Sequence, residues 1–237
     1  MKKIVAQFSQ HFKEVIYGGI DGIVTTFAVV SGFAGAALTN DATTQLSFLI
    51  VLLFGLANLF ADAASMGLGS FLSLRSEKDL YNTIRTKEAQ SLAAGKEEGV
   101  AETIRLMQVK GFSEEEAKTL ASLYQNNQEF WLDFLMQHGQ DMPDPRGENE
   151  IFNGLATFIS FMVFGAVPLL PFMLSESGDP KTAYIISLVG TFMALILLGI
   201  LKWRVTGAKL LPSLLEVVLV GGTASILAYF VGVIFSV

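Results

Sequence analysis

The sequence predicts an all-α membrane protein with five transmembrane helices and a helical insertion between the second and the third. Of its 237 residues, 51% are hydrophobic, and the 19 phenylalanines outnumber the 16 lysines and arginines. Charged residues are concentrated in a few blocks, unlike the scatter expected on a globular surface. The uncharged stretches between them approach or exceed the roughly 20 residues needed to cross a bilayer core, and they are 22–40, 42–61, 151–175, 182–201 and 217–237.

The first 14 residues mix polar with apolar side chains and are too polar to cross a bilayer. Their apolar residues can share one helical face while their lysines reach anionic lipid headgroups. This pattern predicts an interfacial helix at 1–14. The first two transmembrane helices are expected within 15–74, the second being long enough to project into water. The last three are expected within 150–237, where Pro168 should kink the third.

Residues 75–149 change character, with 14 acidic side chains against nine basic ones. A capping box from Ser113 to Glu116 opens one helix, and Pro143 and Pro145 end the helical part. This composition predicts a water-exposed helical domain that resembles a metal-binding domain. We expect its small core to contain Leu106, Leu120, Leu123, Trp131 and Leu135.

Five transmembrane helices place the two ends of the chain on opposite sides of the membrane. Because basic residues favour the cytoplasmic side, we expect the N-terminus and 75–149 in the cytoplasm and the C-terminus outside. The short insertion and the absence of a targeting tail favour a bacterial plasma membrane. The side taken as cytoplasmic carries Lys2, Lys3, Lys13, Lys202, Arg204 and Lys209, whereas the other carries Asp41, Glu176, Asp179 and only Lys181.

The stretch from Gly55 to Leu72 places polar side chains deep in the second apolar segment. Asn58, Asp62 and Met66 are spaced by four, so a helix brings them onto one face. A stripe of small residues beside them would let another helix approach closely. An ionisable residue at membrane depth is costly and marks a candidate functional site. The alternative for Asp62 is a structural hydrogen bond between helices.

Asp21 adds a second carboxylate in the first third of the first transmembrane helix. With Asn58, Asp62 and Met66 it offers oxygen donors and one sulfur. Fe²⁺ and Mn²⁺ accept such a mixture, whereas Mg²⁺ and Ca²⁺ gain nothing from a thioether. Asp21 and Asp62 are also the candidates for carrying protons. The alternative for Asp21 is a helix cap or an interfacial carboxylate.

Several side chains of the insertion could gather a second metal ion on the cytoplasmic side. Glu98 and Glu102 lie one helical turn apart and therefore share a face. The alternative is that the charges simply form a solvated helix face. The candidate donors are Glu88, Glu97, Glu98, Glu102, Asp133, Met136 and His138.

An enzymatic function finds little support in the sequence. It contains no HExxH, no GxSxG and no phosphate-binding loop, and both histidines, His11 and His138, lie outside the expected membrane helices. The absence of cysteine excludes disulfides and thiolate metal sites. We expect no permanently bound cofactor and no nucleic-acid partner.

The segments YGGIDGIVTTFAVVSGFAGA and NLFADAASMGLGSFLS, with NQEFWLDFLMQH and PDP in the insertion, closely resemble the vacuolar iron transporter family. The resemblance covers almost the whole chain and is to a bacterial-type member. It implies a five-span homodimer that exports Fe²⁺ or Mn²⁺ from the cytosol in exchange for protons. It also implies a path at the dimer interface, lined by Asp21 and Met66, with cytoplasmic glutamates and methionines that collect the metal.

Some positions depart from the family pattern. Asn58 stands where plant-type members have a glutamate, and Asp62 follows one turn later. Of the two methionines that the family has in the last cytoplasmic helix, this chain keeps only Met136. Gly139 stands where the family has a nearby glutamate, and Arg105 occupies a position expected to be acidic. We therefore predict a weakened cytoplasmic metal site beside an intact membrane path, with the choice between iron and manganese open.

The alternative function is a membrane-anchored metal sensor or scaffold, in which the acidic insertion signals and no ion crosses. Such a protein has no need of an ionisable residue like Asp62 at membrane depth. The polar face of the second transmembrane helix therefore favours transport. The resemblance to the family implies a secondary transporter for metal homeostasis and detoxification.

Overall fold

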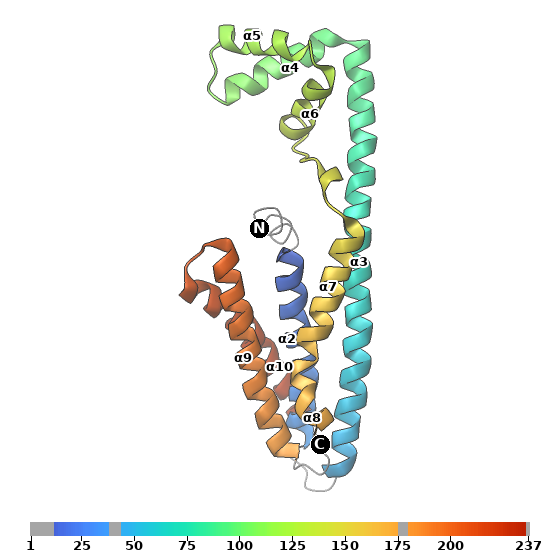
Figure 1. Cartoon of the computed structure of the whole chain (residues 1–237), viewed down its shortest axis with the longest axis vertical. Helices are drawn as coiled ribbons and strands as arrows, with labels where there is room; N and C mark the ends of the chain where they lie inside the picture. The colour runs from blue at the N-terminus through green and yellow to red at the C-terminus, as the bar shows by residue number, and fades with distance from the viewer. Residues whose placement is uncertain (1–11, 38–43, 175–179, 236–237) are drawn as a thin grey trace, which may run out of the picture. The chain divides into compact units, whose positions relative to one another are not determined.

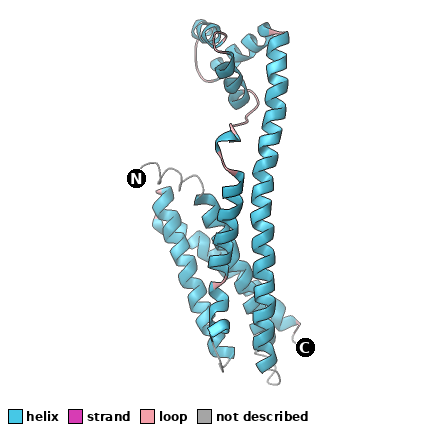
Figure 2. Cartoon of the chain, turned by 45° about the vertical axis from the view of Figure 1, so that its right-hand side comes forward, coloured by secondary structure: helices cyan, strands magenta, loops and turns pink. Residues whose placement is uncertain are grey.

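The computed structural model describes residues 12–37, 44–174 and 180–235, and every regular element within these ranges is a helix (Figures 1 and 2). Most of the expected interfacial helix at 1–14 lies outside the described residues. The chain divides into two compact units. The membrane unit consists of Met1–Phe71 and Glu150–Val237, and the insertion unit consists of Leu72–Asn149.

Five helices are long and apolar enough to cross a membrane, which confirms the predicted fold class. Each follows from an uncharged stretch, because a bilayer offers the backbone no water to bond with and only a helix satisfies it internally. The five are α2 (Phe12–Ala37), α3 (Thr44–Ala94), α7 (Glu150–Gly165) with its continuation, α9 (Pro180–Thr206) and α10 (Leu210–Ile234).

The third of these helices is broken near its end, as predicted. After α7 the chain forms a short 3₁₀ segment, η2 (Val167–Leu169), and then α8 (Leu170–Leu174). Pro168 causes the break because it has no N–H to continue the helical ladder. The hydroxyl of Ser187 on α9 donates to the carbonyl oxygen of Pro168 at 2.7 Å, which satisfies a backbone group at the break.

Helix α2 packs closely against α7 and α10, and glycine makes both contacts possible. A Cβ added at Gly22 would lie 2.5 Å from the carbonyl oxygen of Phe161 on α7. A Cβ added at Gly232 on α10 would overlap the carbonyl oxygen of Gly32 on α2. Small residues thus let α2 approach its neighbours at backbone distance, as is usual between membrane helices.

The insertion unit contains the end of α3 and three further helices, α4 (Lys96–Val109), α5 (Glu114–Tyr124) and α6 (Gln128–His138), followed by η1 (Pro145–Gly147). The predicted capping box is confirmed at the start of α5. The hydroxyl of Ser113 accepts from the backbone N–H of Glu116, whose carboxylate accepts from the backbone N–H of Ser113.

The core of the insertion unit is built around Trp131, which is 2% exposed, together with Leu106 and Leu135. The expectation that Leu123 belongs to this core is wrong, because its side chain is 58% exposed. Helix α5 turns Ala117 and Ala121 toward the core, and Leu123, six residues after Ala117, points about 120° away around the helix axis.

Two helix boundaries differ from the sequence prediction. Helix α2 includes 12–14, which the sequence analysis assigned to the interfacial helix at 1–14. Helix α10 begins at Leu210, seven residues before the uncharged stretch 217–237. Pro212 is tolerated there because the first turn of a helix has no N–H partner to lose.

Candidate functional site

Asn58 and Asp62 form a hydrogen-bonded pair on α3. The amide nitrogen Nδ2 of Asn58 donates to Oδ2 of Asp62 at 2.7 Å, and both side chains are partly buried. Their spacing of four places them one turn apart on the same face, as the sequence predicts. The pair orients one oxygen of the carboxylate and leaves Oδ1 available to another partner.

Asp21 on α2 is half-buried and lies close enough to Asp62 for the two carboxylates to interact electrostatically. Neither forms a salt bridge within the part of the chain that the structure describes. Two like charges from different helices, held away from bulk water, repel each other unless a cation or a proton lies between them. The arrangement is therefore suited to binding positive charge.

Met66, the third member of the predicted face, is partly buried and packs against the apolar cluster around Leu59 and Phe161. This contact places it within the packed part of the membrane unit, next to α7. Its role as a metal ligand stays a prediction.

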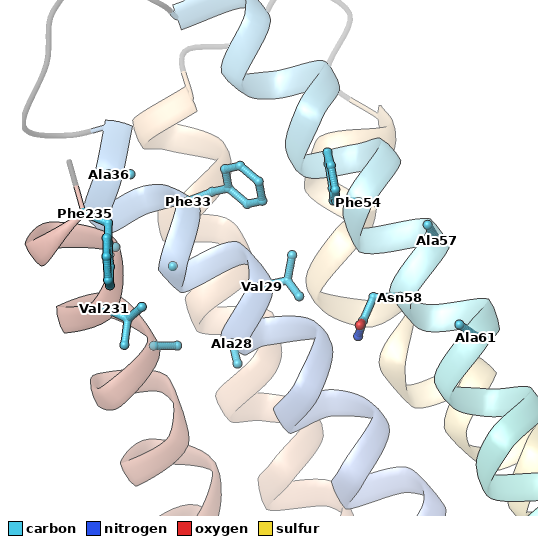
Figure 3. Close-up of a pocket in the computed structure, with 13 residues that line it drawn as sticks. Ala28, Val29, Phe33, Ala36, Phe54, Ala57, Asn58, Ala61, Val231 and Phe235 are labelled. Carbon is cyan, nitrogen blue, oxygen red and sulfur yellow. The ribbon is translucent and has the colours of Figure 1, made fainter. Parts of the chain in front are cut away.

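A groove of about 860 Å³ opens beside Asn58, between α2, α3 and α10 (Figure 3). Asn58 projects from α3 into the space that faces α2, as the close-up shows. It is the one polar side chain in the lining, since the others are apolar or glycine. They are Ala28, Val29, Gly32, Phe33, Ala36, Phe54, Ala57, Ala61, Ala228, Val231, Gly232 and Phe235.

Glu14 is a buried acidic residue that the sequence analysis did not single out. It lies in the first turn of α2 and is only 7% exposed. Its Oε1 lies 3.6 Å from Nζ of Lys13, whereas Oε2 has no hydrogen-bond partner within the described structure. Glu14 and Asp21 are seven residues apart, which places them two turns apart on one helical face. That spacing is the signal that could have identified it.

Two acidic candidates of the insertion unit, Glu88 and Glu102, already have protein partners. Arg105 donates to both carboxylate oxygens of Glu102, and these hydrogen bonds lower the pKa of Glu102 from its ordinary value. Glu88 accepts a hydrogen bond of 3.3 Å from the amide of Gln140. Glu98 is exposed on α4.

The remaining candidates of the insertion unit lie on α6. Met136 is fully buried in the core, and the ring of His138 packs edge-on against Phe134, with centroids 4.8 Å apart. Among the residues that the structure describes, no three acidic, histidine or cysteine side chains are grouped to hold a metal ion. The ligand roles assigned to Glu88, Glu98, Glu102, Met136 and His138 therefore stay predictions.

A different cluster of charges joins α3 to α6 and to the segment that follows it. Arg85 on α3 bonds to Glu129 at 2.5 Å and to Asp133 at 3.1 Å. Arg146 bonds to Asp144 at 2.7 Å and lies over the ring of Tyr81. Apart from the pair of Arg146 with Asp144, these contacts connect residues far apart in the sequence, so no local pattern could predict them. Arginine side chains thus supply the positive charge that Asp133 would otherwise take from a metal.

Comparisons with known proteins cover nearly the whole chain. The model of the VIT family matches residues 12–233. The vacuolar iron transporter 1 of Arabidopsis thaliana is 32% identical over 219 residues, covering 92% of this chain and 83% of the relative. The vacuolar iron transporter of Toxoplasma gondii is 32% identical over 236 residues, covering 94% of this chain and 74% of the relative. That of Plasmodium falciparum is 29% identical over 231 residues, covering 94% of this chain and 82% of the relative. The match extends over all five membrane helices, and the chain belongs to the VIT family.

Proposed function

We propose that this protein is a secondary transporter that exports Fe²⁺ or Mn²⁺ from the cytosol in exchange for protons. The observation that carries the proposal is the pair of like-charged carboxylates, Asp21 and Asp62, contributed by different membrane helices. Because relatives of this chain are named as iron transporters, we propose that the cation bound between these carboxylates is a metal ion. The metal is cargo in this proposal, and no resident cofactor is needed.

The donor set fits this cargo. Asp21 and Asp62 supply carboxylate oxygens, Asn58 an amide oxygen, and Met66, if it turns toward them, a thioether sulfur. Fe²⁺ and Mn²⁺ accept oxygen together with softer ligands. When the metal leaves, the two carboxylates need positive charge again, and protons can supply it. Metal binding and proton binding at the same groups are the requirement for exchange.

The proposed transporter is a homodimer in which a second copy covers the face of α3 beside Asn58. The small side chains Ala57, Ala61 and Ser65 are exposed on this face, and a Cβ added at Gly69 would meet no atom within 4 Å. Such a surface allows another membrane helix to approach closely. The resemblance to the family supports an ion path at that interface.

We further propose a bacterial plasma membrane with the N-terminus and 75–149 in the cytoplasm and the C-terminus outside. The turn between α9 and α10 supports this orientation. It carries Arg204 and Lys209 next to Trp203, as is typical of a cytoplasmic membrane boundary. The relatives are named as vacuolar. Across a vacuolar membrane or a plasma membrane, the proposed transport removes the metal from the cytosol.

Reconstituted liposomes test the proposal. The protein would be reconstituted into liposomes that enclose a pH dye and a metal indicator. Fe²⁺ and Mn²⁺ would then be added outside in separate experiments. We expect metal entry with proton flux in the opposite direction, and its loss in Asp21→Asn and Asp62→Asn. Thr223→Val is the matched control, because Thr223 is exposed on α10 and bonds only to its own helix.

Two results would contradict the proposal. Metal binding to well-folded protein without any flux would support the sensor or scaffold instead. Metal flux with no accompanying proton movement would leave a transporter but remove the exchange mechanism.

A further inference from the structure

We propose that Asn58 is a positioning residue that restricts Asp62 to a single coordinating oxygen and thereby makes the site select against Ca²⁺. This inference rests on the proposed function, since it concerns the choice among ions at the same site. It assigns Asn58 a role distinct from metal ligation, acting through its amide nitrogen.

The geometry that carries the inference is the hydrogen bond between the two side chains. Nδ2 of Asn58 lies 2.7 Å from Oδ2 of Asp62, a normal length for an amide donating to a carboxylate. Both side chains are partly buried at membrane depth, where little water is available to replace the amide as donor. One acceptor site of Oδ2 is thus taken by the amide, which turns this oxygen toward Asn58. Oδ1 accepts no such hydrogen bond and is the oxygen freer to meet an ion.

The surroundings offer Asp62 no substitute for this donor in the adjacent groove. Apart from Asn58, the residues lining the groove are alanine, glycine, valine and phenylalanine (Figure 3). A carboxylate with one fixed partner keeps one rotamer, whereas a carboxylate without it can rotate and present both oxygens. The hydrogen bond therefore sets both the orientation and the number of coordinating oxygens of Asp62.

The number of coordinating oxygens matters because divalent ions differ in what they require. Ca²⁺ takes six to eight oxygen ligands and commonly uses both oxygens of a carboxylate. The smaller transition-metal ions are satisfied by fewer ligands and accept nitrogen or sulfur among them. A site with one oxygen from Asp62 is therefore poor in ligands for Ca²⁺ while it remains adequate for Fe²⁺ or Mn²⁺.

A simpler interpretation is that the pair only satisfies two polar groups within one helix, as an amide and a carboxylate four residues apart often do. In that case removing the amide would change expression or overall activity, and every ion would be affected alike. The ratio of the responses to two ions separates the alternatives, because a purely structural role would not change it.

The experiment measures Mn²⁺ uptake by proteoliposomes in the presence of increasing Ca²⁺. Asn58→Leu keeps the size of the side chain and removes the donor, whereas Asn58→Gln retains an amide four residues from Asp62. We expect the Ca²⁺ concentration that halves Mn²⁺ uptake to fall about tenfold or more in Asn58→Leu, which corresponds to about 1.4 kcal/mol. Because Asn58→Leu also removes the amide oxygen proposed as a donor, the Ca²⁺ sensitivity of each variant is expressed relative to its own Mn²⁺ uptake without Ca²⁺. Asn58→Gln should keep most of the discrimination.

An unchanged Ca²⁺ sensitivity in Asn58→Leu would overturn the inference while leaving transport intact. If Asn58→Leu does not accumulate in the membrane, Asn58→Ala provides the same comparison with a smaller side chain. Full Mn²⁺ uptake by Asp62→Asn, or uptake of neither Mn²⁺ nor Fe²⁺ by the unaltered protein, would instead contradict the proposed function. The two failures are thus distinguishable.

Discussion

Arg85 and Asp133, 48 residues apart in the sequence, are joined by two hydrogen bonds of 3.1 and 3.3 Å from the guanidinium to Oδ1. The same guanidinium bonds to Glu129, and its side chain is only 17% exposed. One arginine of α3 therefore holds two acidic residues of α6. Because the pair with Asp133 is partly shielded from water, it should contribute more than an ordinary surface salt bridge.

Arg85→Ala should loosen α6 within the insertion unit. The substitution leaves Glu129 and Asp133 without their strongest partner, and we expect it to cost about 1–2 kcal/mol of stability. Hydrogen–deuterium exchange of the backbone amides of 128–138 in the full-length protein would measure the effect. Arg105→Ala is the control, since the pair of Arg105 with Glu102 is exposed and lies within one helix. Equal exchange in both variants would contradict the prediction.

The insertion unit should lose stability in acid through Asp144. The guanidinium of Arg146 donates to this carboxylate and holds the pKa of Asp144 below its ordinary value of 3.8. A carboxylate with a lowered pKa stabilises the folded state above the pKa of the unfolded chain and loses that contribution as the pH falls through the folded value. The loss should therefore begin near pH 4 and continue below it.

Fluorescence of the buried Trp131 reports this transition in a Trp203→Phe background. We expect urea unfolding of the insertion unit to require less denaturant at pH 3 than at pH 6. The difference between the two pH values should shrink in Asp144→Asn, which removes the titrating group. An identical pH dependence in this variant would show that other carboxylates are responsible.

Much of the fold could be predicted because its signals are local. The absence of charge across each span determines the membrane helices, and Ser113 with Glu116 determines the start of α5. The hydrogen bond between Asn58 and Asp62 likewise follows from a spacing of four on one helix. Each of these features depends on residues within a few turns of one another.

The rest depends on how separate helices pack, which one sequence does not reveal. The sequence offers Asp21 and Asp62 as members of one site, but their proximity depends on how α2 and α3 pack. Met136 is polarizable enough to be a ligand, and only the assembled core shows that it is fully buried. Arg85 finds its partners on a different helix, so the acidic residues of α6 looked available for metal.

Thr103→Val should destabilise the insertion unit although it preserves the shape of the side chain. The indole nitrogen of Trp131 donates to the hydroxyl of Thr103 at 2.8 Å, and both groups are buried. Valine would leave the indole N–H without a partner, at a cost of about 1–3 kcal/mol. Urea unfolding followed by Trp131 fluorescence would measure this. Thr119→Val on α5 is the control, because Thr119 is exposed and bonds only to the backbone of its own helix.

The packing of α10 against α2 leads to a prediction with a matched control in the same helix. A Cβ at Gly232 would overlap the carbonyl oxygen of Gly32, a backbone atom that cannot move unless the helices separate. Gly232→Ala should therefore cost about 3 kcal/mol or more. Gly222→Ala, ten residues earlier, places its Cβ where no atom lies within 4 Å and should be nearly neutral.

The two alanine variants would be compared in detergent by the temperature at which each loses its monodisperse elution peak. A lower temperature for Gly232→Ala and an unchanged one for Gly222→Ala would establish the close crossing of α2 and α10. Because Gly232 and Gly32 both line the groove beside Asn58, widening that crossing should also alter the groove. Equal stability of the two variants would show that α10 does not pack against α2 at backbone distance.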